Sequence, residues 1–128
     1  MANILVIDDD EAVRDMVKSI LAVGGHTVLF AADGRSGMQR MTEGKIDLII
    51  TDIIMPDQEG IETIQQLRRL GAKLPILAIS GGGQRGHADF LSVARELGAT
   101  DTLAKPFRAK DLIAKITTLL GGNTNAAA

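Results

Sequence analysis

Short apolar stretches alternate along this chain with segments of helical periodicity, and this alternation is the feature that most constrains its fold. Several of the apolar runs lack the polar alternation of a half-exposed strand, so both faces of their sheet should be covered. The pattern therefore predicts parallel strands joined by crossover helices. The predicted strands are Ile4–Ile7, Thr27–Phe30, Asp47–Thr51, Ile76–Ile79 and Asp101–Ala104.

The segments between these runs predict five helices. The first ends at Gly24-Gly25. The second is the weakest, because Gly37 lies inside it, and we expect it to be short and mobile. The five are predicted as a helix through Val13 and Leu21, about Asp33–Glu43, near Glu59–Leu70, Phe90–Leu97, and Ala109–Leu120 before Gly121-Gly122.

Composition excludes several classes of function. A length of 128 residues predicts one domain, residues 1–121, with residues 122–128 as a disordered tail or a remnant of cloning. The absence of cysteine excludes disulfides and thiolate metal sites. A net charge of −2 argues against direct binding of nucleic acid or of an anionic membrane. No signal-peptide pattern or spanning segment is found, so we expect a cytoplasmic protein.

Polar residues with chemical potential follow the predicted strands. Ligand sites of open parallel sheets lie beyond the carboxyl ends of the strands, where the chain changes direction across the sheet. We therefore expect the residues at these positions to converge on one edge. They are Asp8, Asp9, Asp52, Ser80 and Lys105 with Pro106.

Three consecutive carboxylates, Asp8 to Asp10, follow the first strand. A helix N-terminus needs one acidic cap, and Asp10 suits that structural role. Like charges crowded at a strand end repel one another unless a cation or solvent offsets them. Mg²⁺ binds carboxylates, carbonyl oxygens and water, so Asp8, Asp9 and Asp52 form a candidate magnesium site.

Asp52 stands among isoleucines in the segment LIITDIIMPDQEG. Taken alone it is best explained as a turn residue before Pro56, although Asp57 fits that role better. A carboxylate beside Mg²⁺ can instead attack a phosphoryl group and form an acyl phosphate. Lys105 and Ser80 could then bind the phosphoryl oxygens. Taken alone, however, Lys105 also fits a solvated surface charge and Ser80 a cap at the end of a strand.

Together these motifs resemble the receiver domain of two-component response regulators, of the CheY-like type. The similarity spans roughly Ala2 to Leu120 and rests on Asp8-Asp9, on TDIIMPDQEG around Asp52, on Ser80 and on GATDTLAKPF. It implies a doubly wound, flavodoxin-like sandwich of five βα units with a parallel sheet in the order 2-1-3-4-5. It also implies a phosphoprotein of a phosphorelay that catalyses only its own phosphorylation and dephosphorylation, and so is not an enzyme in the ordinary sense.

The resemblance implies a role for each matching acidic position. Asp52 is the implied phospho-acceptor, which takes its phosphoryl group from a sensor histidine kinase or a phosphotransfer protein. Asp9, Asp52 and the backbone carbonyl of Ile54 are the implied Mg²⁺ ligands, with Asp8 acting through water. The implied downstream partner is a protein target or an output domain, and the expected state is a monomer that dimerises, if at all, on phosphorylation.

Ser80 and Lys105 match the hydroxyl and ammonium groups that bind phosphoryl oxygens in this family, and a cis peptide bond is implied at Lys105–Pro106. The sequence departs from the family at Thr102, where many receivers carry an aromatic residue that swings inward. Signal output is then expected mainly from movement of the glycine-rich loop beginning at Gly81 or from the face of the last two helices. Ser80, Thr102 and Gly81 are the candidate switch positions.

Two other functions fit parts of the sequence. A Mg²⁺-dependent aspartyl-phosphate phosphatase would use the same nucleophile, but such enzymes carry a second Asp where this chain has Ile54. The segment GGGQRG, Gly81–Gly86, satisfies the nicotinamide-binding pattern G-x-G-x-x-G, with Asp101 near the ribose-binding spacing. That pattern belongs to the first βα turn, and Asp101 begins a strand instead of ending one.

Overall fold

Five parallel strands form the central sheet in the order β2-β1-β3-β4-β5, which confirms the predicted fold class. The computed structural model describes residues 2–52, 59–69, 73–80, 95–96, 98–105 and 107–127. The strands are β1 (Asn3–Ile7), β2 (Thr27–Ala31), β3 (Leu48–Asp52), β4 (Ile76–Ser80) and β5 (Asp101–Ala104). The described helices are α1 (Glu11–Val23), α2 (Gly34–Glu43), α3 (Glu59–Arg69) and α5 (Ala109–Ala127).

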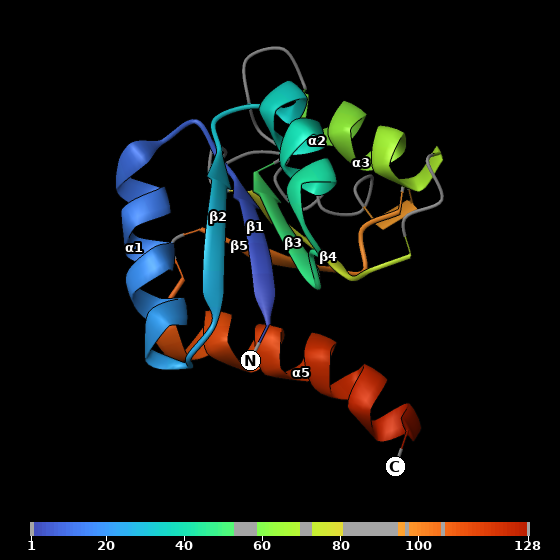
Figure 1. Cartoon of the computed structure of the whole chain (residues 1–128). Coiled ribbons are helices and arrows are strands. Elements are labelled where there is room, and N and C mark those ends of the chain that lie inside the picture. Colours follow the sequence, from blue (N-terminus) through green and yellow to red (C-terminus); the bar gives the residue numbers. More distant parts are fainter. Residues whose placement is uncertain are drawn as a thin grey trace.

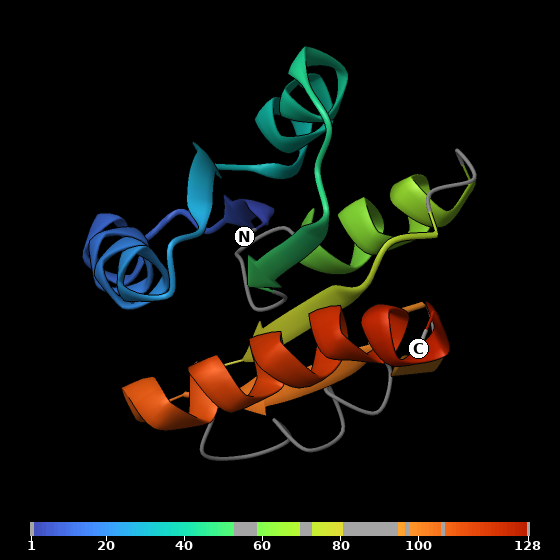
Figure 2. The same cartoon turned by 60° about the horizontal axis from the view of Figure 1, so that its bottom comes forward.

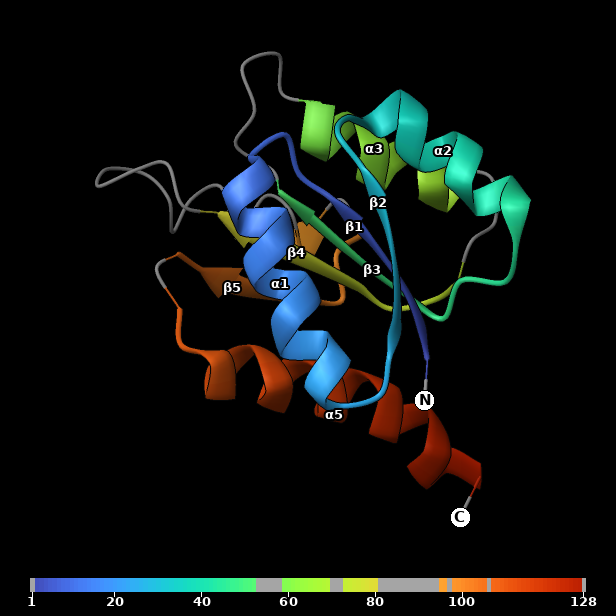
Figure 3. The same cartoon turned by 60° about the vertical axis from the view of Figure 1, so that its left-hand side comes forward.

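Helices cover both faces of the sheet (Figures 1, 2 and 3). α1 and α5 lie on one face, whereas α2 and α3 lie on the other. The alternation of side chains along β1 supplies both cores, because Ile4 and Val6 pack with α1 and α5 while Leu5 and Ile7 pack with α2 and α3. All four side chains are buried, and each contributes about 1.5–3 kcal/mol by leaving water.

Aspartate side chains begin the two helices that flank β2. Asp10 Oδ1 accepts hydrogen bonds from the backbone N–H groups of Ala12 at 2.9 Å and Val13 at 3.4 Å, which confirms its predicted role as the start of α1. Asp33 Oδ1 accepts from the backbone N–H of Ser36 at 2.8 Å and caps α2 in the same way. The third aspartate of the run after β1 therefore serves the helix, which leaves its two neighbours for other contacts.

Two buried glycines bring α2 close to its neighbours. A Cβ at Gly34 would collide with the hydroxyl of Thr63 on α3, and one at Gly37 would lie 2.5 Å from Ile7 Cδ1 on β1. Gly37 weakens the helical pattern of the sequence, but in the fold it is a packing position where only hydrogen fits. Whether α2 is mobile, as the sequence predicts, stays a prediction.

Several element boundaries differ from the sequence prediction: β1 begins one residue earlier, and β2, β3 and β4 each end one residue later. β3 includes Asp52 as its last residue. α5 continues past Gly121 to Ala127, so the predicted end before Gly121-Gly122 is wrong. A glycine inside a helix costs only about 1 kcal/mol relative to alanine, which does not by itself end a helix that is already packed. The division into residues 1–121 and a tail of residues 122–128 stays a prediction.

The fourth predicted helix lies largely outside the described residues, although residues 95 and 96 are helical. The turn at Gly98 is held by Arg68 of α3, whose guanidinium donates to the carbonyl of Gly98 from Nε at 2.9 Å and from Nη2 at 2.7 Å. Gly98 has φ +130°, a conformation that favours glycine. This contact ties α3 to the turn that leads into β5.

No helix among the described residues is long and apolar enough to cross a membrane.

Replacing a helical glycine by alanine usually stabilises a protein, but the packing of Gly37 predicts the opposite effect. Gly37→Ala should lower the free energy of unfolding by about 1–3 kcal/mol, because the added methyl group overpacks the contact with Ile7 and outweighs the gain in propensity. Gly121→Ala in α5 is the matched control, since a Cβ there meets nothing within 4 Å, and it should stabilise the protein by up to about 1 kcal/mol. Urea unfolding measures both; equal effects would contradict the packing role of Gly37.

Candidate functional site

Parallel pairing places two aspartates side by side at the carboxyl edge of the sheet. Ile7 of β1 pairs with Thr51 of β3, so Asp8 and Asp52 follow on adjacent strands. The backbone N–H of Asp8 donates to the carbonyl of Ala31 at 3.0 Å, and Asp8 Oδ1 accepts from the backbone N–H of Asp10 at 2.8 Å. These two bonds fix the residue and its carboxylate at the end of the ladder.

Asp8, Asp9 and Asp52 form an acidic cluster, as the sequence predicts. One carboxylate oxygen of each lies within 4.8 Å of the others. Asp8 is 2% and Asp52 6% exposed, whereas Asp9 is exposed. Carboxylate oxygens without nitrogen or sulfur ligands are the donor set that hard cations such as Mg²⁺ prefer. The cluster could therefore hold a divalent cation, with solvent reaching it from the side of Asp9.

Lys105 reaches the acidic cluster from the strand at the far edge of the sheet. It follows β5, and its Nζ lies 3.2 Å from Asp8 Oδ2 and 3.2 Å from Asp52 Oδ2. The side chain crosses the end of β4 to do so, because β4 lies between β5 and β3. One ammonium thus bridges the two buried carboxylates, whereas the sequence predicted only that Lys105 lies at the same edge and could bind phosphoryl oxygens.

Electrostatics in the cluster favour a charged lysine. Burial by itself lowers the pKa of Lys105, but the negative charges of Asp52 and Asp8 and their hydrogen bonds outweigh it, so the pKa lies above its ordinary value. Among the described residues, three carboxylates form the cluster and the ammonium of Lys105 contacts two of them, so negative charges outnumber positive ones there. A divalent cation would offset that excess.

The other predicted site positions are described in part. The backbone of Ser80 ends β4 and pairs with Ala104 of β5, which puts it on the same edge as Asp52 and Lys105. Ile54, Gly81 and Pro106 lie outside the described residues. Thr102, which replaces the aromatic residue of many receivers, lies within β5 directly after Asp101 and is half-buried.

Asp101 has a structural role that the sequence did not reveal. Its carboxylate accepts from Arg95 Nη2 at 2.7 Å, from Lys115 Nζ of α5 at 2.9 Å and from the backbone N–H of Thr102 at 2.8 Å. Burial raises its pKa, but the bonds from Lys115, Thr102 and Arg95 outweigh this effect and the pKa lies below its ordinary value. The positive charges of Arg95 and Lys115 were a signal in the sequence, but nothing in the pattern paired them with the negative charge of Asp101.

Comparison with known proteins identifies the family. The model of the response regulator receiver domain matches residues 4–117. The chain is 36% identical over 122 residues to the response regulator MprA of Mycolicibacterium vanbaalenii, covering 95% of this chain and 52% of that protein. It is similar to a crystal structure of a receiver domain protein from Clostridium thermocellum, with a TM-score of 0.86, 29% identity and coverage of 98% of this chain and 99% of that one.

A CheY-like receiver domain protein from Methanospirillum hungatei gives the same TM-score of 0.86 at 27% identity, with 98% of each chain covered. The fold is that of CheY-like receiver domains. The chain belongs to the response regulator receiver domain family of two-component systems. It spans about half the length of MprA.

The raised pKa of Lys105 predicts a loss of stability in alkaline solution without Mg²⁺. A raised pKa means that the folded protein holds the proton more tightly than the unfolded chain, so this contribution is complete below the ordinary value of 10.5. It disappears as the pH rises through the folded-state pKa. The chain has no Tyr or Cys to titrate in the same range.

Unfolding in urea between pH 9 and 12 measures this loss, the range being set by about one and a half pH units on either side of the ordinary lysine pKa. Lys105→Met should remove the part of the alkaline loss that belongs to this group. Lys110→Met is the control, because Lys110 is exposed on α5 and makes no ion pair with a described residue. An identical pH profile for wild type and Lys105→Met would contradict the bridge.

Proposed function

We propose that the chain is a phospho-accepting receiver whose Asp52 takes a phosphoryl group from a phosphohistidine of a sensor histidine kinase or a phosphotransfer protein. The observation that carries the proposal is the position of Asp52, a buried carboxylate that contacts the ammonium of Lys105 inside the acidic cluster. Such a carboxylate is held in one place and stays next to a group that can take up phosphoryl charge.

The donor set of the cluster supports Mg²⁺ as the cofactor. Asp9 and Asp52, with the backbone carbonyl of Ile54, would bind it directly, and Asp8 would act through water. When bound, Mg²⁺ would neutralise charge on the transferring phosphoryl oxygens. The exposed position of Asp9 leaves room for the water ligands that Mg²⁺ retains.

The residues of the chain then act on the phosphoryl group by position and charge. An oxygen of Asp52 attacks phosphorus in line, the P–N bond of the phosphohistidine breaks, and its electron pair leaves with the imidazole nitrogen. Lys105, which contacts both buried carboxylates, would move its ammonium onto a phosphoryl oxygen. The hydroxyl of Ser80, at the end of β4, would bind another phosphoryl oxygen.

The two alternative functions have less support. A phosphatase that passes through an aspartyl phosphate needs an acid or base beside its nucleophile, and the chain has Ile54 at the corresponding position. A nicotinamide site would need Asp101 to bind ribose, but three donors already occupy that carboxylate. The first observation argues against a phosphatase with repeated catalytic cycles and the second against a nicotinamide site, so both favour the signalling role.

Downstream, the signal would pass to a protein target or an output domain, and phosphorylation could be accompanied by dimerisation of an otherwise monomeric chain. Thr102 cannot act as an aromatic rotamer switch. Asp101 joins residue 95, β5 and α5 through one carboxylate, so these three parts of the surface would move together when Ser80 and Lys105 engage the phosphoryl group.

The proposed acceptor can be tested by mass. Incubation with Mg²⁺ and a small phosphodonor should add one phosphoryl group to the wild-type protein and none to Asp52→Asn, because an amide is not a nucleophile toward phosphorus. Asp47→Asn is the matched control, since the Asp47 carboxylate accepts from the backbone N–H of Asn3 at the opposite end of the sheet. Intact mass spectrometry reads all three, and addition to both wild type and Asp52→Asn, or to neither, would overturn the assignment.

The metal site can be tested by stability. Mg²⁺ at about 100 times its dissociation constant should raise the free energy of unfolding by about 2.7 kcal/mol. Asp9→Asn should lose most of this gain and, without Mg²⁺, should be at least as stable as wild type, because one of the crowded charges is gone. Asp15→Asn removes an exposed acid on α1, outside the cluster, and should behave as wild type in thermal unfolding with and without Mg²⁺. Equal gains in all three proteins would exclude the acidic cluster as the metal site.

A further inference from the structure

A second hollow lies at the carboxyl end of β2, between α1 and α2. Its volume is about 440 Å³, and it is lined by Arg14 of α1 and by Ser36, Gln39, Arg40 and Glu43 of α2. None of these residues belongs to the acidic cluster at the ends of β1 and β3. β2 is an edge strand, so the hollow is not covered by a further strand.

Two bonds orient the guanidinium of Arg40. Its Nε donates to the carbonyl of Phe30 at 3.1 Å, and its Nη1 donates to Glu43 Oε1 at 2.9 Å. Its Nη2 makes no bond within the described part of the chain. Because the Phe30 carbonyl holds one side of the planar group, the remaining donors keep a fixed direction.

Arg14 brings a second positive charge to the same hollow. It is half-buried, and its guanidinium makes no ion pair or hydrogen bond to any described residue. Among the described residues that line the hollow, two guanidinium groups lie with one carboxylate, that of Glu43, which already forms an ion pair with Arg40. The arrangement leaves an excess of positive charge and unused N–H donors.

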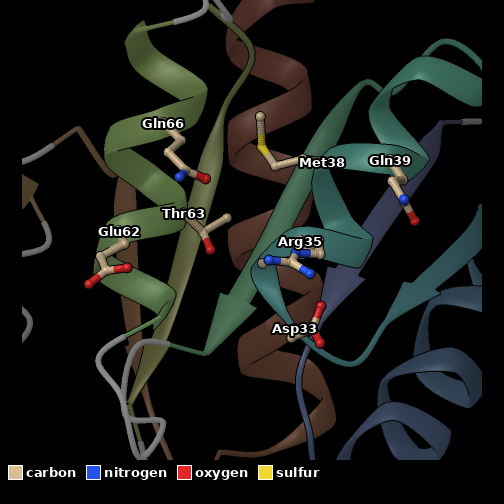
Figure 4. Close-up of a pocket in the computed structure, with 8 residues that line it drawn as sticks. Asp33, Arg35, Met38, Gln39, Glu62, Thr63 and Gln66 are labelled. Carbon is tan, nitrogen blue, oxygen red and sulfur yellow. The ribbon is translucent and has the colours of Figure 1, made fainter.

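The neighbouring hollow between α2 and α3 shows that this charge balance is specific (Figure 4). That hollow measures about 550 Å³, and its one guanidinium, from Arg35, lies with the carboxylates of Asp33 and Glu62. One positive and two negative side chains among its lining residues leave an excess of negative charge. An anion would gain little there, so two similar hollows on the two sides of α2 differ in the ligand they favour.

We propose that the hollow at the end of β2 is a binding site for an oxyanion, with Arg14 and Arg40 as its recognition groups. Guanidinium groups bind carboxylate and phosphate oxygens in pairs, and a partly desolvated site strengthens such bonds. The amide of Gln39 adds a further donor. The oxyanion is free phosphate or the acidic side chain of a protein that approaches this edge of the sheet.

Titration of the ¹⁵N-labelled protein with inorganic phosphate, at constant ionic strength and without Mg²⁺, tests the proposal. The amide signals of Ala32, Ser36 and Arg40 should shift and saturate. Arg14→Gln should raise the dissociation constant about tenfold or more, the expected loss for one charged hydrogen-bond donor. It should fold normally, because the Arg14 side chain bonds to no described residue. Arg35→Gln is the matched control on the same helix and should bind as wild type.

A parallel titration with a short glutamate-rich peptide distinguishes the two sources of the oxyanion. Saturation by phosphate supports a free anion, and saturation by the peptide alone supports an acidic protein partner. Asp52→Asn should bind in the same way, so failure of phosphorylation and failure of this site can be told apart. The proposal is overturned if neither probe saturates these signals, if shifts occur only around Asp8 and Lys105, or if Arg14→Gln and Arg35→Gln weaken binding equally.

Discussion

The bridge from Lys105 to Asp8 and Asp52 is the interaction on which the functional edge of this receiver depends. Parallel pairing of β1 with β3 forces two carboxylates together at adjacent strand ends, and both are buried. Such a pair is tolerated because an ammonium from the far side of β4 contacts each of them. Two further contacts fix the backbone beside these three residues. Arg68 binds the turn before β5, and Asp10 caps α1 directly after Asp8 and Asp9.

Close packing of α2 against β1 and α3 restricts which side chains fit near this edge of the sheet. The helix meets β1 and α3 through glycines, so backbone and side chain approach more closely than any larger residue allows. Ile7, which Gly37 contacts, directly precedes Asp8. The position of a site residue is therefore coupled to a helix that carries none of the acidic cluster.

Much of the fold and site could be predicted from the sequence, because both depend on local patterns. Apolar runs give the strands, and strand-end residues such as Asp8, Asp52 and Lys105 meet wherever parallel strands share an edge. The strand order came from family resemblance and not from periodicity. The role of Gly37, the bonds of Asp101 and the shared hollow of Arg14 and Arg40 could not be predicted, since each depends on segments brought together only by packing.

The bond from Arg40 to Phe30 also affects whether a second molecule can pair with the edge strand β2. Strands at the margin of a sheet expose alternate carbonyl groups that a strand from another molecule can pair with. In β2 one such carbonyl already accepts a hydrogen bond from a charged side chain, so it is not free to pair with an incoming strand. Pairing of a second molecule with β2 would therefore require this bond to break.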